Sequence, residues 1–167
     1  MNIHIKLITC SIFVLISGMS PAADEESLSI VVESVKWPEI KVKMVNTGKL
    51  TINIWSSAMS WGYYGRSFVI HSSSDEGIIA CIITPKEKTF TMNFPVVHNI
   101  QPKEVFIETI NLFDGYWIFT FKPNDLEGSK FSIKAILEVK KTSNTIEHGV
   151  VTGKWTSPPK KISPEGN

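Results

Sequence analysis

Apolar and polar residues alternate along much of the chain after residue 28, with the period of two that predicts β-strands covered on one face. In KFSIKAILEV, apolar residues stand at every second position, and serine, lysine and glutamate fill most of the positions between them. We expect this apolar set to face the core: Phe131, Ile133, Ala135, Leu137 and Val139. Truncation of Phe131 or Leu137 would then leave a destabilising cavity.

Two shorter stretches follow the same rule, EIKVKM and KTFTMNF. We expect their inward residues to be Ile40, Val42 and Met44 in the first and Phe90, Met92 and Phe94 in the second. Further strands are predicted near residues 28–35, 66–72, 78–84, 104–110, 116–121 and 146–155. The prolines at positions 85, 95, 102 and 123 fall between these ranges, where they remove no ladder hydrogen bond.

The segment 102–113 allows two interpretations. Pro102 could begin a helix, and Phe106, Ile110 and Phe113 have helical spacing. We favour a strand because the segment contains several β-branched residues: Val105, Ile107, Thr109 and Ile110. The whole pattern predicts an all-β fold, a single immunoglobulin-like antiparallel β-sandwich of about 8–9 strands.

The stretch KVKMVNTGKLTINIW reads as a hairpin, with a turn from Asn46 to Lys49 between two alternating strands. Gly48 could take a positive φ in this turn at little cost. The stretch IHSSSDEG, residues 70–77, reads as a strand end that runs into a polar turn. Asp114 and Gly115 read as another turn, before a buried strand.

The first 23 residues have the features of a secretory signal peptide. Lys6 precedes an apolar run from Leu7 to Met19, which is followed by small residues and then by acids. We expect three regions, a signal peptide at 1–23, a β-sandwich domain at 24–157 and a disordered polar tail at 158–167. The signal peptide predicts an exported protein, and no later stretch is long enough for a transmembrane anchor.

The cysteine content favours the bacterial periplasm over a eukaryotic secretory route. After removal of residues 1–23 the chain retains one cysteine, Cys81, and it has no Asn-x-Ser/Thr glycosylation sequon. Cys81 lies in the apolar run GIIACIIT, which is typical of an inert core thiol. We expect the fold to be independent of disulfides.

Charge and motifs argue against several classes of function. Without Lys6 the chain has 16 basic and 16 acidic residues, and no basic stripe indicates nucleic-acid binding. No phosphate-binding glycine loop is present, so no cofactor is expected. His71, His98 and His148 lack a second ligand at local metal-site spacing, so we expect surface or edge roles and no metal site, with a zinc site assembled from distant residues as the open alternative. A serine-hydrolase elbow is missing from YGRSFVI.

Four motifs in sequence order resemble bacterial immunoglobulin-like sandwiches, including the BsuPI-type proteinase-inhibitor family. They are VNTGKLTINIW, GRSFVIHSSSDEG, IQPKE and DLEGSKFSIKAILEV. Leu126, Gly128 and Phe131 match a leucine-x-glycine corner before an aromatic, although the family pattern prefers tyrosine at the third position. Lys103 stands where the pattern has glycine after Pro102. The resemblance, over about residues 40–155, implies a non-enzymatic domain that binds another protein.

The stretch SWGYYGRSF, residues 60–68, is our candidate partner-binding site. Its candidate binding residues are Trp61, Tyr63, Tyr64 and Arg66, which is the chain's one arginine. Tryptophan, tyrosine and arginine are the residue types enriched at binding hot spots. Gly62 and Gly65 interrupt the alternation and predict a loop. The aromatic side chains could cap the core or stand out as anchors, and we favour the cap. In an intermediate arrangement, Trp61 and Phe68 would be core, while Tyr63, Tyr64 and Arg66 would face outward.

The function that this pattern favours is an exported binding module for a protein partner, such as an inhibitor, an immunity-type protein or an envelope assembly factor. The alternative is a carbohydrate-binding module, in which exposed aromatics stack on sugar rings. A small hydrolase is the least favoured reading. A flat row of exposed aromatics would favour sugar, whereas an apolar patch rimmed by charges would favour protein.

Overall fold

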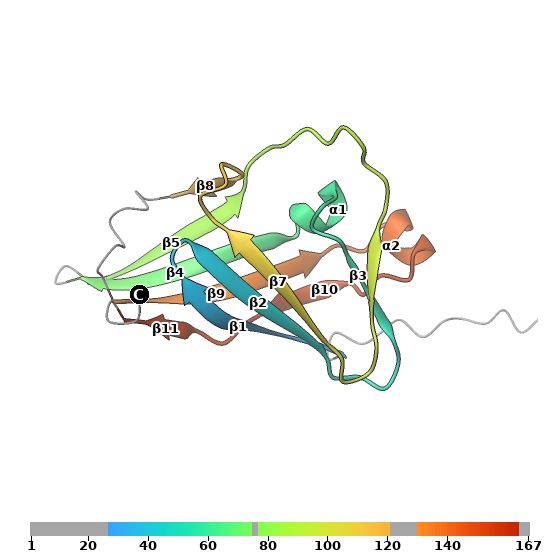
Figure 1. Ribbon diagram of the computed structural model, residues 1–167, viewed down its shortest axis with the longest axis horizontal. Coiled ribbons are helices and arrows are strands. Elements are labelled where there is room, and N and C mark those ends of the chain that lie inside the picture. Colours follow the sequence, from blue (N-terminus) through green and yellow to red (C-terminus); the bar gives the residue numbers. More distant parts are fainter. Residues whose placement is uncertain (1–26, 75–76, 121–129, 164–167) are drawn as a thin grey trace, which may run out of the picture.

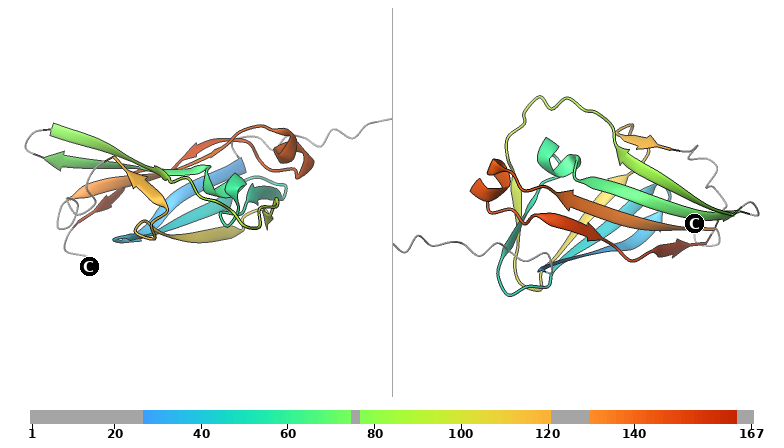
Figure 2. Two further views of the ribbon diagram at one scale, coloured as in Figure 1. Left: turned by 90° about the horizontal axis from the view of Figure 1, so that it is seen from above. Right: turned by 180° about the vertical axis from the view of Figure 1, so that it is seen from behind.

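The computed structural model describes residues 27–74, 77–120 and 130–163. Eleven strands and two short helices are found in these ranges, and two antiparallel sheets pack against each other (Figures 1 and 2). The all-β prediction is therefore confirmed, with more strands than expected. The predicted signal peptide at 1–23 and the Leu126 and Gly128 corner lie outside the described residues. No helix within the described ranges has the length and apolar character needed to cross a membrane.

The first sheet has three strands in the order β1-β2-β7, and the second has the order β10-β9-β4-β5-β8 with β11 also paired to β9. A ribbon of two strands, β3 and β6, lies beside them. Strands A-B-E and G-F-C-C′ of a variable-type immunoglobulin domain follow the same order. The bounds are β1 Leu28–Lys36, β2 Glu39–Asn46, β3 Ile52–Trp55, β4 Arg66–Ser74, β5 Gly77–Pro85, β6 Val97–Ile100, β7 Val105–Asn111, β8 Trp117–Phe119, β9 Phe131–Val139, β10 Gly153–Thr156 and β11 Lys160–Ile162.

The core lies between the two sheets, and alternation along the strands supplies it. All five expected residues of β9 are buried, as are Ile40, Val42 and Met44 of β2. Phe68 and Ile70 of β4 and Ile83 of β5 are also fully buried. Residues 105–111 form β7, so the strand interpretation of this segment is confirmed. Cys81 is a buried free thiol, as the apolar run around it predicted.

The hairpin predicted at residues 46–49 is wrong. β2 pairs with β1 and β7, whereas β3 pairs with β6, so the segment between β2 and β3 leaves the first sheet. Gly48 does not have a positive φ. Instead, the buried Asn46 amide donates to the carbonyls of Leu50 and Ile100, at 2.7 and 2.8 Å. These bonds attach the end of β2 to the ribbon, an arrangement that a local turn pattern could not predict.

Two predicted strands do not form as expected. Residues 88–94 have no regular structure, Met92 and Phe94 are exposed, and Phe90 is half-buried. The range 146–155 is divided between helix α2, Ser143–Glu147, and strand β10. Thr142 caps α2 by accepting from the Thr145 amide, and the Thr145 hydroxyl is in turn the acceptor for the Thr142 amide. This capping box fixes the start of α2, and the helix takes the place of the first part of the predicted strand.

The tail and one proline also differ from the prediction. Lys160–Ile162 form β11, which pairs with Ile133, Ser132 and Phe131 of β9, so this part of the predicted disordered tail is a strand. Pro85 is the last residue of β5 and pairs with Trp117 of β8, rather than lying between strands. β11 is a short strand paired to β9 alone, and Pro85 stands at the very end of β5, so neither needs a complete ladder of hydrogen bonds.

Candidate functional site

The stretch 60–68 begins with a single helical turn, α1, Ser60–Tyr63, and continues into β4. The stretch does connect two strands, β3 and β4, but one turn of helix replaces part of the predicted loop. α1 packs directly on the end of β3, so a Cβ added at Gly62 would stand only 2.2 Å from the Ser56 carbonyl oxygen. A Cβ at Gly65 would stand 2.6 Å from the Glu138 carbonyl oxygen of β9. These two glycines are needed for close backbone approach.

Trp61 lies half-buried against the core, with its ring centroid 6.0 Å from that of Trp55. Phe68 is fully buried, as expected. The packing of Trp61 over Trp55 at the end of the ribbon matches the cap that we favoured. Trp55 also contacts His148 edge to face, at 5.5 Å between ring centroids.

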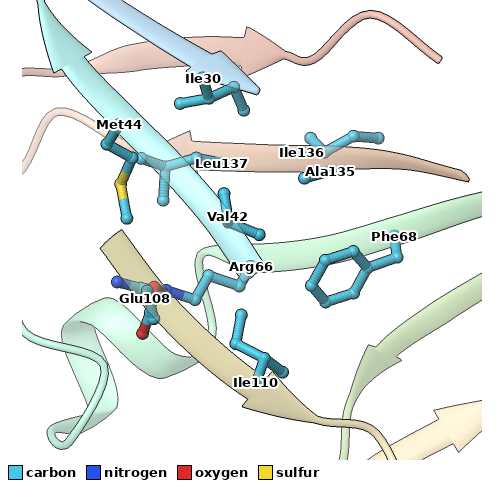
Figure 3. A pocket seen from close by; sticks show the side chains of 10 residues that line it. All are labelled: Ile30, Val42, Met44, Arg66, Phe68, Glu108, Ile110, Ala135, Ile136 and Leu137. Carbon is cyan, nitrogen blue, oxygen red and sulfur yellow. Dashed lines mark hydrogen bonds and ion pairs between the residues drawn. The ribbon is translucent and has the colours of Figure 1, made fainter. Parts of the chain in front are cut away.

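Arg66 does not face outward. Its side chain is buried between the sheets, and its Nε donates to Glu108 Oε2 of β7 at 2.7 Å (Figure 3). Its other nitrogens donate to the carbonyl oxygens of Gly62 and of Trp55. One guanidinium thus joins β4, β7, α1 and β3. The prediction of an outward Arg66 is wrong because a buried carboxylate 42 residues away compensates its charge.

The apolar side chains around this ion pair leave little free space. They surround a cavity of about 20 Å³, which has room for about one water molecule (Figure 3). Its lining is apolar apart from the ion pair: Ile30, Val42, Met44, Phe68, Ile110, Ala135, Ile136 and Leu137. The centre of the sandwich is therefore a packed core rather than a ligand pocket.

Tyr63 does not face outward either. It is 7% exposed, and its single hydroxyl proton is shared between the carbonyl oxygens of Lys86 and Tyr116. Burial raises the pKa of the Tyr63 phenol, and the nearby Tyr64 and Asp114 raise it further. Tyr63 is thus a neutral donor that attaches α1 to the segment after β5 and to the β7–β8 turn.

Tyr64 is the one predicted site residue that is largely exposed, at 47%. Its hydroxyl donates to the Lys88 carbonyl oxygen at 3.1 Å and accepts from the Lys88 amide at 3.0 Å. The residue is about half exposed, and its hydroxyl holds the backbone of Lys88 in place. Tyr64 is therefore both an exposed surface residue and a tether.

The tyrosines hold segment 86–96, the connection between β5 and β6 that arches over α1 (Figure 1). Asn93 Oδ1 accepts from the Ser60 amide at 3.2 Å, and the Val96 carbonyl accepts from the Ser56 amide at 2.9 Å. Met92 and Phe94 of this segment remain 73% and 53% exposed. An irregular segment with several attachments thus presents large apolar side chains to solvent.

Aromatic rings gather where segment 86–96 meets α1 and the β7–β8 turn. Phe90 lies 5.8 Å from Tyr63 and 6.2 Å from Tyr64 between ring centroids. The ammonium of Lys88 lies over three rings, at 4.0 Å from the centroid of Tyr116, 5.2 Å from Phe90 and 5.6 Å from Tyr63. We call Tyr63, Phe90 and Tyr116 the aromatic cage.

Residue patterns missed the partners of the predicted site. Glu108 stands between Phe106 and Ile110 on the inward face of β7, so an acid at a core position was the available signal for a buried ion pair. Lys88 and Phe90 were placed in a strand that does not form. The described residues contain no group of three His, Cys, Asp or Glu side chains positioned to hold a metal ion.

Comparisons with known proteins found no match among protein-family models, curated proteins or solved structures.

Proposed function

We propose that this chain is an exported, non-enzymatic binding module of the bacterial periplasm that recognises a protein partner through Tyr64 and segment 86–96. The observation that carries the proposal is the exposure of Met92 and Phe94 on a segment that the scaffold holds in place. A protein that exposes large apolar side chains on an ordered surface has a surface suited to a partner. Prior ordering also reduces the entropy lost on binding.

The arrangement of the rings favours protein over carbohydrate. Tyr64 makes interplanar angles of 69° with both Tyr63 and Phe90. A platform that stacks on sugar rings needs coplanar faces, whereas these rings meet edge to face. The exposed Lys86 and Glu87 lie on the same segment as the apolar side chains, which supports a protein interface with a charged rim.

The resemblance to BsuPI-type inhibitors makes inhibition one form that this recognition would take. The immunoglobulin-like strand order is consistent with that resemblance, and many unrelated functions share such sandwiches. The proposal therefore rests on the surface itself.

The test is capture from periplasmic extract by the tagged protein. The double variant Met92→Ser with Phe94→Ser should lose a partner that the parent captures in stoichiometric amount, and its melting curve should stay unchanged because both side chains are exposed. Leu50→Ser is the matched control. Leu50 is 61% exposed and precedes the Ile52–Ile100 end of the ribbon, whereas segment 86–96 joins its Trp55–Val97 end.

Equal capture by the parent and the double variant would exclude segment 86–96 as the interface. Binding to a glycan array without any captured protein would support the carbohydrate alternative.

A further inference from the structure

The aromatic cage around Lys88 is a cation-binding arrangement that the proposed protein interface does not require. Three rings face one ammonium group, each within about 6 Å of it, which is the range of effective cation–π attraction. Within the described residues, Lys88 forms no ion pair with a carboxylate. The rings are therefore the main groups that attract its charge.

The walls of the cage are held without the Lys88 side chain. The Tyr63 hydroxyl is bonded to the Lys86 and Tyr116 carbonyls, which fixes one ring and the backbone beside another. The Tyr64 hydroxyl holds both the amide and the carbonyl of Lys88. Removal of the lysine side chain would thus leave the Tyr63 ring and the backbone that carries the other two rings attached.

The cage also has an anionic group close to it and an opening to solvent. Asp114 Oδ1 accepts from the Tyr116 amide at 2.9 Å, so a carboxylate lies on the turn that carries one wall. Tyr116 is among the exposed residues, which leaves a path for the lysine to leave and another cation to enter.

We propose that this cage binds a trimethylammonium group, which displaces the Lys88 ammonium. A primary ammonium keeps strong hydrogen bonds to water, so it gains little from an aromatic cage that is open to solvent. A quaternary ammonium has no N–H to hydrate, and aromatic cages are the usual receptors for it. Lys88 occupies the cage in the free protein and returns to water when the ligand enters.

The experiment is an NMR titration with choline, and neopentyl carbinol serves as its uncharged carbon isostere. Ring currents should shift the choline methyl protons upfield on binding, and should already shift the Lys88 ε-methylene protons in the free protein. Choline should return those lysine signals towards their solvent position, while the carbinol should not.

Two variants sharpen the test. Lys88→Ala should bind choline about tenfold more tightly than the parent, because no internal cation competes. Phe90→Leu, which keeps apolar bulk but removes one ring, should weaken binding. Phosphatidylcholine vesicles, compared with free choline, distinguish a lipid headgroup from a soluble ligand as the source.

The proposal is overturned if Lys88→Ala gives no saturable shift, or if the carbinol binds as well as choline. Absence of ring-current shifts on Lys88 in the parent protein would overturn it without any variant.

Discussion

The Arg66–Glu108 pair is a buried charged contact between the two sheets, from β4 to β7. Its side chains are buried, whereas the Lys154–Glu138 pair is exposed. Glu108→Leu should lower the free energy of unfolding by about 3–5 kcal/mol, because it leaves the Arg66 charge buried without a counter-ion. Glu138→Leu is the control and should cost less than about 1 kcal/mol. Urea denaturation measures both free energies of unfolding. Equal losses in the two variants would refute a structural role for the Arg66–Glu108 ion pair.

Cys81 gives a pH dependence whose sign follows from its environment. Burial raises the pKa of its thiol above the ordinary 9.0, so the unfolded chain loses this proton at a lower pH than the folded protein does. The contribution is complete below pH 9.0 and is lost as pH rises through the raised folded value. Between these limits, stability should fall more steeply in the parent than in Cys81→Ala.

Urea titrations at a series of pH values measure this difference. Parallel pH profiles for the two proteins would contradict it. A thiol reagent should also modify native Cys81 only as fast as the protein opens.

At the scale of elements, α1 depends on a glycine. Gly62→Ala should destabilise the fold by about 1–3 kcal/mol or more, since the new methyl meets the backbone of Ser56 and Trp55. Gly48→Ala is the comparison, because its nearest contact is the side chain of Ser27 at 3.1 Å and its φ is ordinary. Thermal unfolding should give a lower melting temperature for Gly62→Ala than for Gly48→Ala. A melting temperature for Gly62→Ala equal to or above that of Gly48→Ala would show that α1 can move away from β3.

At the scale of the whole molecule, loss of the Tyr64 hydroxyl should let segment 86–96 open locally while the sandwich stays folded. Tyr64→Phe removes the hydroxyl that bonds to the Lys88 amide and carbonyl, a loss of about 0.5–1.5 kcal/mol per bond. Trypsin should then cleave after Lys86 or Lys88 faster than in the parent, with a nearly unchanged melting temperature.

Tyr116→Phe is the matched control for this experiment. The structure shows no hydrogen bond from the Tyr116 hydroxyl to another described residue, so cleavage of this variant should match the parent. Faster cleavage in both variants would point to ring packing rather than the tether.

Alternation identified the strands that lie within the sheets, and it failed where no neighbouring strand pairs with the alternating segment. β9 and β2 were predicted with their correct faces because each has a covered side and a wet side along its whole length. KTFTMNF alternates equally well but has no sheet to join, so its phenylalanines and methionine do not face a core. A period of two is thus a statement about a strand only where a neighbouring strand is available.

The amino-acid sequence by itself determined the all-β class, the faces of the central strands, the buried Cys81 and the aromatic stretch after β3. These follow from local periodicity and from the burial of apolar surface, which neighbouring residues specify. Only the tertiary structure decided that Asn46 joins the end of β2 to the β3–β6 ribbon, that Arg66 is buried and that the Lys88 ammonium lies within the aromatic cage. Each of these depends on an atom far along the chain: the Ile100 carbonyl, the Glu108 carboxylate and the Tyr116 ring. The same side chain is exposed or buried according to whether the fold supplies that partner.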